Sequence, residues 1–388
     1  MVDVNLFIFL AGAFILTIVI GKLLEKIRVP WIFGALLVGT GLAAYNPFAS
    51  VTSSATFSFL ANLGMYFLLL LIGYEIDMKE MMQKAGFIFK STFFIIFFEA
   101  IFGTLLIHFI FGTSWLLSTL VAVSFATVGE AILIPILDEF RITNTKLGQS
   151  IIGIGTLDDV IEIATIILAG VLVGVKNSVP GTALPDIFVI IGIFAVLIAM
   201  AIVIRKARHV RFRSINMMFI FMMMILFLFL GIGQYGESAA FAALLAGIAL
   251  RGFLPKERLG LIGDQIRMLC YGFFAPMFFL SVGLELDLSY VFSSFLIVVI
   301  VVVVTTLAKI TSSYIMGKKK MGARQSVLMG IGLSIRFSTS IIIIKILLDT
   351  GLIGISLYSV IVASNIVFNF VVPVLFSNLV VKWRKYIK

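Results

Sequence analysis

The chain has 388 residues, of which 61% are hydrophobic and only 12% are charged, and its formal net charge is +10. This composition excludes an ordinary water-soluble domain, in which about a quarter of the residues are charged. The basic residues lie in short segments between apolar runs, so they favour membrane orientation over nucleic-acid binding as the reason for the positive charge.

The sequence has no motif of an enzyme or of a resident metal centre. The one cysteine, Cys270, and the two histidines, His108 and His209, share no metal-ligand spacing. Phosphate-binding loops and nucleophile elbows are not found either. We therefore expect a protein that is not an enzyme and has no cofactor.

Apolar runs and the breakers between them divide the chain into about thirteen expected membrane spans. The first begins after Asp3, where a signal peptide would have basic residues, so we expect it to be retained. The predicted fold is therefore an all-α, multi-pass membrane protein. The expected spans are residues 4–25, 30–46, 55–75, 86–111, 114–137, 146–175, 186–205, 213–233, 237–253, 262–286, 290–316, 323–348 and 354–381.

Lysine and arginine gather in every second loop between these spans. They begin with Lys26 and Arg28 after the first span and return in the carboxyl-terminal tail, and Lys176 is the main exception. Because basic residues are retained on the cytoplasmic side, the pattern predicts an outside amino terminus and a cytoplasmic carboxyl terminus in the cell (inner) membrane.

Two motifs recur at a nearly constant separation. Residues 33–42 (FGALLVGTGL) resemble residues 241–250 (FAALLAGIAL), and residues 71–77 (LIGYEID) resemble residues 281–287 (SVGLELD). The copies fall seven spans apart, an odd number, so they point in opposite directions. This predicts the inverted-topology repeat of many secondary transporters, although small-residue motifs also recur in helix packing alone.

Polar and glycine-rich stretches interrupt two of the expected spans. Thr127, Gly129 and Glu130 lie in span 114–137, and Arg336 and Ser338 lie in span 323–348. Such stretches indicate broken helices whose free backbone groups and end dipoles face a cavity. We expect the two broken helices to cross beside the adjacent acids Asp158 and Asp159.

Two adjacent acids, Asp158 and Asp159, lie in the middle of span 146–175. Ionisable groups inside the bilayer are costly and are therefore functional candidates. Removal from water favours the protonated carboxyl group, and the same oxygens suit a hard cation. Competition between a cation and a proton at these acids is the chemistry of an antiporter, although a structurally neutralised pair is the alternative. Thr156 is a further possible ligand, and the role of Glu162 stays open.

Lys309 lies deep in span 290–316 and is the natural counter-charge for the acids. The alternative is that it extends to the membrane interface. Its counterpart in the repeat is Glu99. The repeat therefore places opposite charges at equivalent positions.

The segment Gly73-Tyr-Glu-Ile-Asp77, the pair Asp158 and Asp159, and Lys309 together resemble the transmembrane unit of the monovalent cation:proton antiporter-2 family. That family includes Na⁺/H⁺ and K⁺/H⁺ exchangers and Kef-type potassium efflux systems. The resemblance implies exchange of a monovalent cation for protons by an elevator-like motion, and we favour Na⁺ slightly over K⁺. It implies that Asp159 is the principal cation and proton ligand. Asp158 would pair with Lys309, a combination typical of electrogenic exchangers.

The resemblance also implies a domain organisation and a homodimer. Residues 1–85 and 213–288 would form the dimerisation scaffold, residues 86–176 and 289–388 the ion-carrying core, and residues 177–212 the linker. Kef-type systems usually add a soluble regulatory domain; in this chain we expect such regulation to need a separate subunit.

The chain departs from the family pattern at the second broken helix. Relatives often have Arg-Gly-Glu there, whereas this chain has Arg336, Phe337 and Ser338. Glu130 in the first broken helix is an additional acid that would replace the missing one or change cation choice or coupling. A gated cation channel and a sodium-coupled organic anion symporter stay as alternatives, and the symporter would need Arg336 for its anion.

Overall fold

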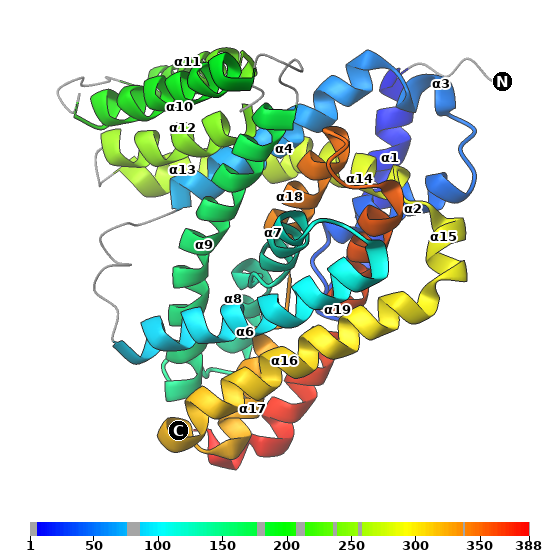
Figure 1. The fold of residues 1–388 in the computed structure, drawn as a ribbon, viewed down its shortest axis with the longest axis vertical. Coiled ribbons are helices and arrows are strands. Elements are labelled where there is room, and N and C mark those ends of the chain that lie inside the picture. Colours follow the sequence, from blue (N-terminus) through cyan, green and yellow to red (C-terminus); the bar gives the residue numbers. More distant parts are fainter. Residues whose placement is uncertain are drawn as a thin grey trace. The chain divides into compact units, whose positions relative to one another are not determined.

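The computed structural model describes residues 6–75, 86–176, 183–206, 214–235, 239–254, 258–336 and 338–387. Within these residues all regular secondary structure is helical, which confirms the predicted fold class (Figure 1). Each of the thirteen expected spans is occupied by one helix or by consecutive helices.

Seven of the described helical segments are long and apolar enough to cross a membrane, so the chain is a multi-pass membrane protein. They are α1 (Leu6–Glu25), α4 (Ala55–Glu75), α6 (Gly86–Phe111), α11 (Ile215–Gln234), Leu259–Leu284, α16 (Phe295–Met321) and Ile355–Tyr386. The count of thirteen spans, and the sidedness of the termini, stay predictions.

Contacts divide the chain into two compact units. The first unit comprises Met1–Ile15, Ala35–Asp77 and Ile166–Gly283. Within it lie α4, α11 and most of α2 (Phe33–Ala44). The other helices of this unit are α3 (Ala49–Thr52), α10 (Ala183–Lys206), α12 (Ala239–Phe253), α13 (Leu259–Leu269), a π-helical turn (Cys270–Phe274) and nearly all of α14 (Ala275–Leu284).

Reciprocal contacts join the two sequence motifs of the repeat inside this first unit. Gly73 of α4 lies so close to α12 that a Cβ atom there would overlap the carbonyl oxygen of Leu244. Gly283 of α14 lies equally close to the carbonyl oxygen of Leu36 in α2. Leu36 and Leu244 are equivalent residues of one motif, and Gly73 and Gly283 are equivalent residues of the other. The two contacts are therefore related by the repeat, and each requires the absence of a side chain.

The second unit comprises Leu16–Gly34, Met78–Thr165 and Leu284–Lys388. Its long helices α6 and α16 pack side by side (Figure 1). It also contains the first two thirds of α9 (Lys146–Lys176), and α19 (Ile355–Trp383) packs against α16 and α17. Its remaining helices are α7 (Trp115–Phe125), α8 (Glu130–Glu139), α15 (Leu288–Ser293), α17 (Ala323–Gly332), α18 (Ser338–Asp349) and a 3₁₀ turn (Arg384–Tyr386).

The predicted scaffold, linker and core assignments are statements about function and stay predictions. Residues 177–182 and 207–212 of the predicted linker lie outside the described residues.

Candidate functional site at two crossing helix breaks

Both helix breaks occur where the polar and glycine-rich stretches predicted them. The first lies between α7 and α8, where residues 126–129 are buried but not helical. The second lies between α17 and α18, and its described residues 333–336 are also buried. Each break ends one helix and begins another inside the protein, so it leaves backbone groups that need partners.

The two breaks meet through a direct hydrogen bond. The backbone N–H of Gly129 donates to the carbonyl oxygen of Ile335 over 2.7 Å. This bond satisfies one free group from each broken helix, and it confirms that the two interrupted helices cross.

Asp158 of α9 lies at the first break. Its carboxylate oxygen Oδ2 accepts a hydrogen bond from the backbone N–H of Val128 over 2.5 Å, and only 1% of the residue is exposed. Val128 precedes the first turn of α8, where the free N–H groups of a helix carry partial positive charge. The break therefore places the partial positive charge of a helix beginning next to the carboxyl group of Asp158.

Lys309 of α16 lies at the carboxyl-terminal ends of α7 and α17, the half-helices that precede the two breaks. Its Nζ donates to the carbonyl oxygens of Ala126 and Leu333 over 2.6 Å and 2.8 Å. These residues follow the last turns of α7 and α17, where free carbonyl groups carry partial negative charge. One ammonium group thus caps both carboxyl-terminal half-helix ends, and the buried charges match the helix dipoles in sign.

Glu99 of α6 joins two buried cations. Its Oε2 lies 3.0 Å from Lys309 Nζ, and its Oε1 forms an ion pair with Nη2 of Arg336. Nη2 of Arg336 also donates to Thr305 Oγ1 over 3.2 Å. All three charged side chains are at most 1% exposed. Since an uncompensated charge would be very costly here, the shared carboxylate of Glu99 helps to keep both cations inside the protein.

The guanidinium group of Arg336 contacts two aromatic rings. Its Cζ lies 3.7 Å from the ring centroid of Phe125 and 4.3 Å from that of Phe368. Such cation–π contacts favour a cation at this position, and they are made more often by arginine than by lysine.

The structure brings together most of the predicted site residues that it describes. Asp158, Thr127, Gly129, Lys309 and Arg336 all lie at or beside the crossing. The hydroxyl group of Thr127 donates a hydrogen bond to the carbonyl oxygen of Ser124, three residues earlier, and so caps a carbonyl group at the end of α7. Thr156 is half-buried and donates to Ile152 of its own helix, and Glu162 is buried one turn after Asp158.

Three predicted residues have side chains outside the described part of the structure: Glu130, Asp159 and Ser338. Their backbones lie at the start of α8, within α9 and at the start of α18. Phe337 lies outside the described residues altogether. Asp159 as the principal ligand therefore stays a prediction.

The structure gives Lys309 an ion-pair partner that the family resemblance did not imply. Lys309 forms its ion pair with Glu99, while Asp158 lies near enough to attract Lys309 and Arg336 electrostatically. A direct pair between Lys309 and Asp158 stays a prediction. Glu99 was recognised from the sequence only as the repeat counterpart of Lys309, and that offset was the one signal of its place in the site.

Comparisons with known proteins agree with this architecture. The family model described as "Sodium/hydrogen exchanger, transmembrane" matches residues 12–382. The probable Na⁺/H⁺ antiporter 3 of Methanocaldococcus jannaschii is 26% identical over 374 residues, which cover 94% of this chain and 94% of that protein. The Na⁺/H⁺ antiporter of Enterococcus hirae is 25% identical over 353 residues, covering 86% and 88% of the two chains.

A solved structure has a similar fold. The sodium proton antiporter MjNhaP1 from Methanocaldococcus jannaschii, determined at pH 8, superposes with a TM-score of 0.64 at 17% identity. The superposition covers 97% of this chain and 98% of that one. At this identity the likeness concerns the fold.

Proposed function

The chain belongs to the sodium/hydrogen exchanger family, and on this basis we propose that it exchanges Na⁺ for protons at Asp158 and Asp159, with Na⁺ preferred over K⁺. It is a membrane transporter for cations and protons and not an enzyme, so the ions that it moves are substrates rather than cofactors. The observation that carries the proposal is the hydrogen bond from Val128 to the buried carboxylate of Asp158 at the crossing of the two broken helices.

The proposed exchange follows from the chemistry of a carboxylate at that position. A proton and a hard cation compete for the same oxygen atoms, so binding of Na⁺ releases the proton. Asp159 is the proposed principal ligand because it follows Asp158 directly in α9. Adjacent residues of a helix point in different directions. Asp158 would therefore hold the break while Asp159 binds and releases the ion.

Electrogenic exchange is the proposed form of transport. The combination of an aspartate pair with Lys309 supports the proposal, because it is the combination that the resemblance associates with electrogenic exchangers. If one monovalent cation replaces two protons, net charge moves in each cycle.

An elevator-like motion is the proposed route across the membrane. Asp158, both helix breaks, Lys309 and Arg336 all belong to the second compact unit, which supports transport by this unit as one body. The scaffold and the homodimer interface would then be provided by residues 1–85 and 213–288, most of which lie in the first unit. This assignment follows the family resemblance.

Reconstitution of the full chain in liposomes tests the exchange. A pulse of Na⁺ should release protons from acid-loaded vesicles, and K⁺ should do so less effectively. Cation flux that neither moves protons nor depends on them would instead identify a gated cation channel. An organic anion symporter is disfavoured because Glu99 already balances Arg336, the residue that would bind the anion.

A further inference from the structure

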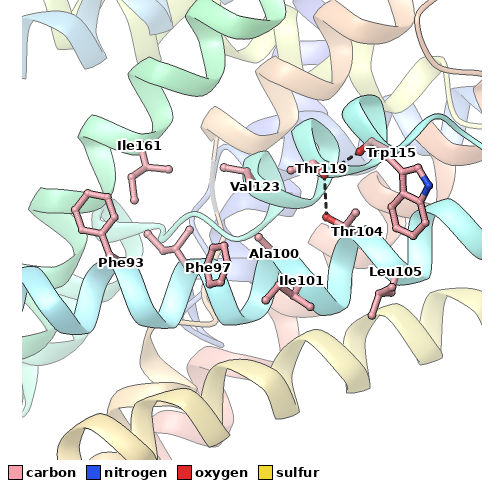
Figure 2. A pocket seen from close by; sticks show the side chains of 11 residues that line it. Phe93, Phe97, Ala100, Ile101, Thr104, Leu105, Trp115, Thr119, Val123 and Ile161 are labelled. Atoms are coloured by element: carbon pink, nitrogen blue, oxygen red, sulfur yellow. Dashed lines mark hydrogen bonds between the residues drawn. The ribbon is translucent and has the colours of Figure 1, made fainter.

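A groove of about 470 Å³ lies along α6 in the second unit (Figure 2). One wall is formed by Phe93, Phe97, Ile101 and Leu105, which are spaced four residues apart and therefore share one helix face. Val123 of α7 and Ile161 of α9 lie opposite them. The groove does not contain any residue of the crossing.

The lining is apolar yet open to the surroundings of the protein. The four α6 side chains are 40% to 67% exposed, although α6 is long and apolar enough to cross a membrane. An exposed apolar face on a membrane span meets lipid rather than water. The groove in this face therefore suits the acyl chain of a lipid.

The groove continues past Phe93 toward the beginning of α6. A neighbouring hollow of about 420 Å³ shares Phe93 and Phe97 and is also lined by Phe89 and Lys90. Residues 89 to 105 of a helix span about 24 Å, which is within the roughly 30 Å hydrocarbon core of a bilayer. The two hollows together are therefore long enough for one extended acyl chain.

Positive charge gathers at the Phe89 end. Lys90 is exposed there, and Lys318, Lys319 and Lys320 are exposed at the adjacent end of α16. Nζ of Lys320 lies 4.4 Å from the ring centroid of Phe87 in the first turn of α6, so the two basic groups belong to one end of the groove. Such lysines attract anionic lipid headgroups.

We propose that this groove is a binding site for one acyl chain of an anionic phospholipid whose phosphate lies at Lys90 and Lys320. The lysines provide the selectivity for anionic over zwitterionic headgroups. The apolar α6 side chains that line the groove hold the acyl chain. Ile161 connects the site to α9, because it follows Asp158 by three residues on that helix. The site is independent of whether the proposed exchange reaction is correct.

Photolabelling of the reconstituted full chain tests the site. The probes are phosphatidylglycerol and phosphatidylcholine with a diazirine in one acyl chain, each in phosphatidylcholine vesicles. Label from phosphatidylglycerol should concentrate on peptides of α6 and α7 that line the groove. Val123→Phe, which fills the groove, should remove this label.

Two further variants complete the design. Val303→Phe changes an exposed apolar residue of α16 outside the groove and should leave the labelling unchanged. Lys90→Gln with Lys320→Gln alters only exposed side chains, so folding is not at risk, and should abolish the preference for phosphatidylglycerol. Label spread evenly over the apolar surface, or equal labelling by both lipids in the unmodified chain, would overturn the proposal.

Discussion

Glu99 and Lys309 are equivalent residues of the two sequence repeats, and they form a buried ion pair with each other over 3.0 Å. Two equivalent residues can touch only beside the pseudo-two-fold axis that relates the repeats. The axis therefore passes near this pair. Acid on one side and base on the other make the centre of a symmetric fold electrostatically asymmetric.

Glu99→Gln should strongly destabilise the protein. The substitution leaves Lys309 and Arg336 buried without their shared counter-charge, which typically costs about 3–5 kcal/mol. Thermal unfolding in detergent measures the loss. The double variant Glu99→Gln with Lys309→Gln removes one charge of each sign and should recover part of the stability. Equal stability of Glu99→Gln and the unmodified chain would show that the ion pair does not stabilise the fold.

Asp159→Asn should abolish Na⁺-dependent proton release while the protein stays folded, because the amide cannot exchange a proton. The measurement is the pH change inside liposomes after a Na⁺ pulse. Asp264→Asn, a change at an exposed acid of α13, is the matched control and should retain the exchange. Unchanged transport by Asp159→Asn would remove this residue from the mechanism.

Asp158→Asn should turn exchange from electrogenic to electroneutral. The amide oxygen can still accept the hydrogen bond from Val128, so the helix break is preserved, but one titrating group is lost. Currents recorded on solid-supported membranes report the change. Asp158→Ala should in addition lower stability by about 1–3 kcal/mol, because it leaves the N–H of Val128 without its acceptor. Persistent current in Asp158→Asn would contradict the assignment.

Lys309→Ala should alter electrogenicity or shift the pH profile of exchange. It also removes the donor to the carbonyl oxygens of Ala126 and Leu333, so each half-helix end loses its cap. The expected cost is about 1–3 kcal/mol for each unsatisfied carbonyl group. Transport currents across a range of pH values provide the readout, and an unchanged profile together with unchanged stability would exclude a role for the lysine.

Gly73→Ala should force α4 and α12 apart and destabilise the protein by about 1–3 kcal/mol, as overpacking usually does. Gly231→Ala in α11 is the control, because a Cβ atom there meets no other group within 4 Å. It should be neutral or slightly stabilising. The measurement is the melting temperature of each variant. Equal values for the two variants would mean that the close approach of α4 and α12 at Gly73 is not required.

The sequence was sufficient to predict the helical spans, their two interruptions and the repeat. These features have local signals: long apolar runs, polar stretches inside them, and motifs at a fixed separation. Short elements such as α3, which lies between two expected spans, and the π-helical turn at Cys270–Phe274, which lies within one, were not predicted, because they are shorter than the patterns from which spans are recognised.

The connections within the site were harder to predict. Arg336 meets Glu99 across 237 residues of sequence, and it also contacts two phenylalanine rings. Nothing in the local pattern around either residue indicates its partner, because pairing between spans depends on how the helices pack. For the same reason the ion pair between Lys309 and Glu99 was not predicted, although their equivalence in the repeat was.

The reciprocal glycine contacts have a consequence for the origin of the protein. Gly73 needs the helix that contains Leu244, and Gly283 needs the helix that contains Leu36, so neither half of the chain can bury its own glycine surface. A half-length ancestor would have needed a second, antiparallel copy of itself. The present chain is then the fusion of two such copies. Later divergence placed an acid, Glu99, in one copy and a base, Lys309, at the equivalent position of the other.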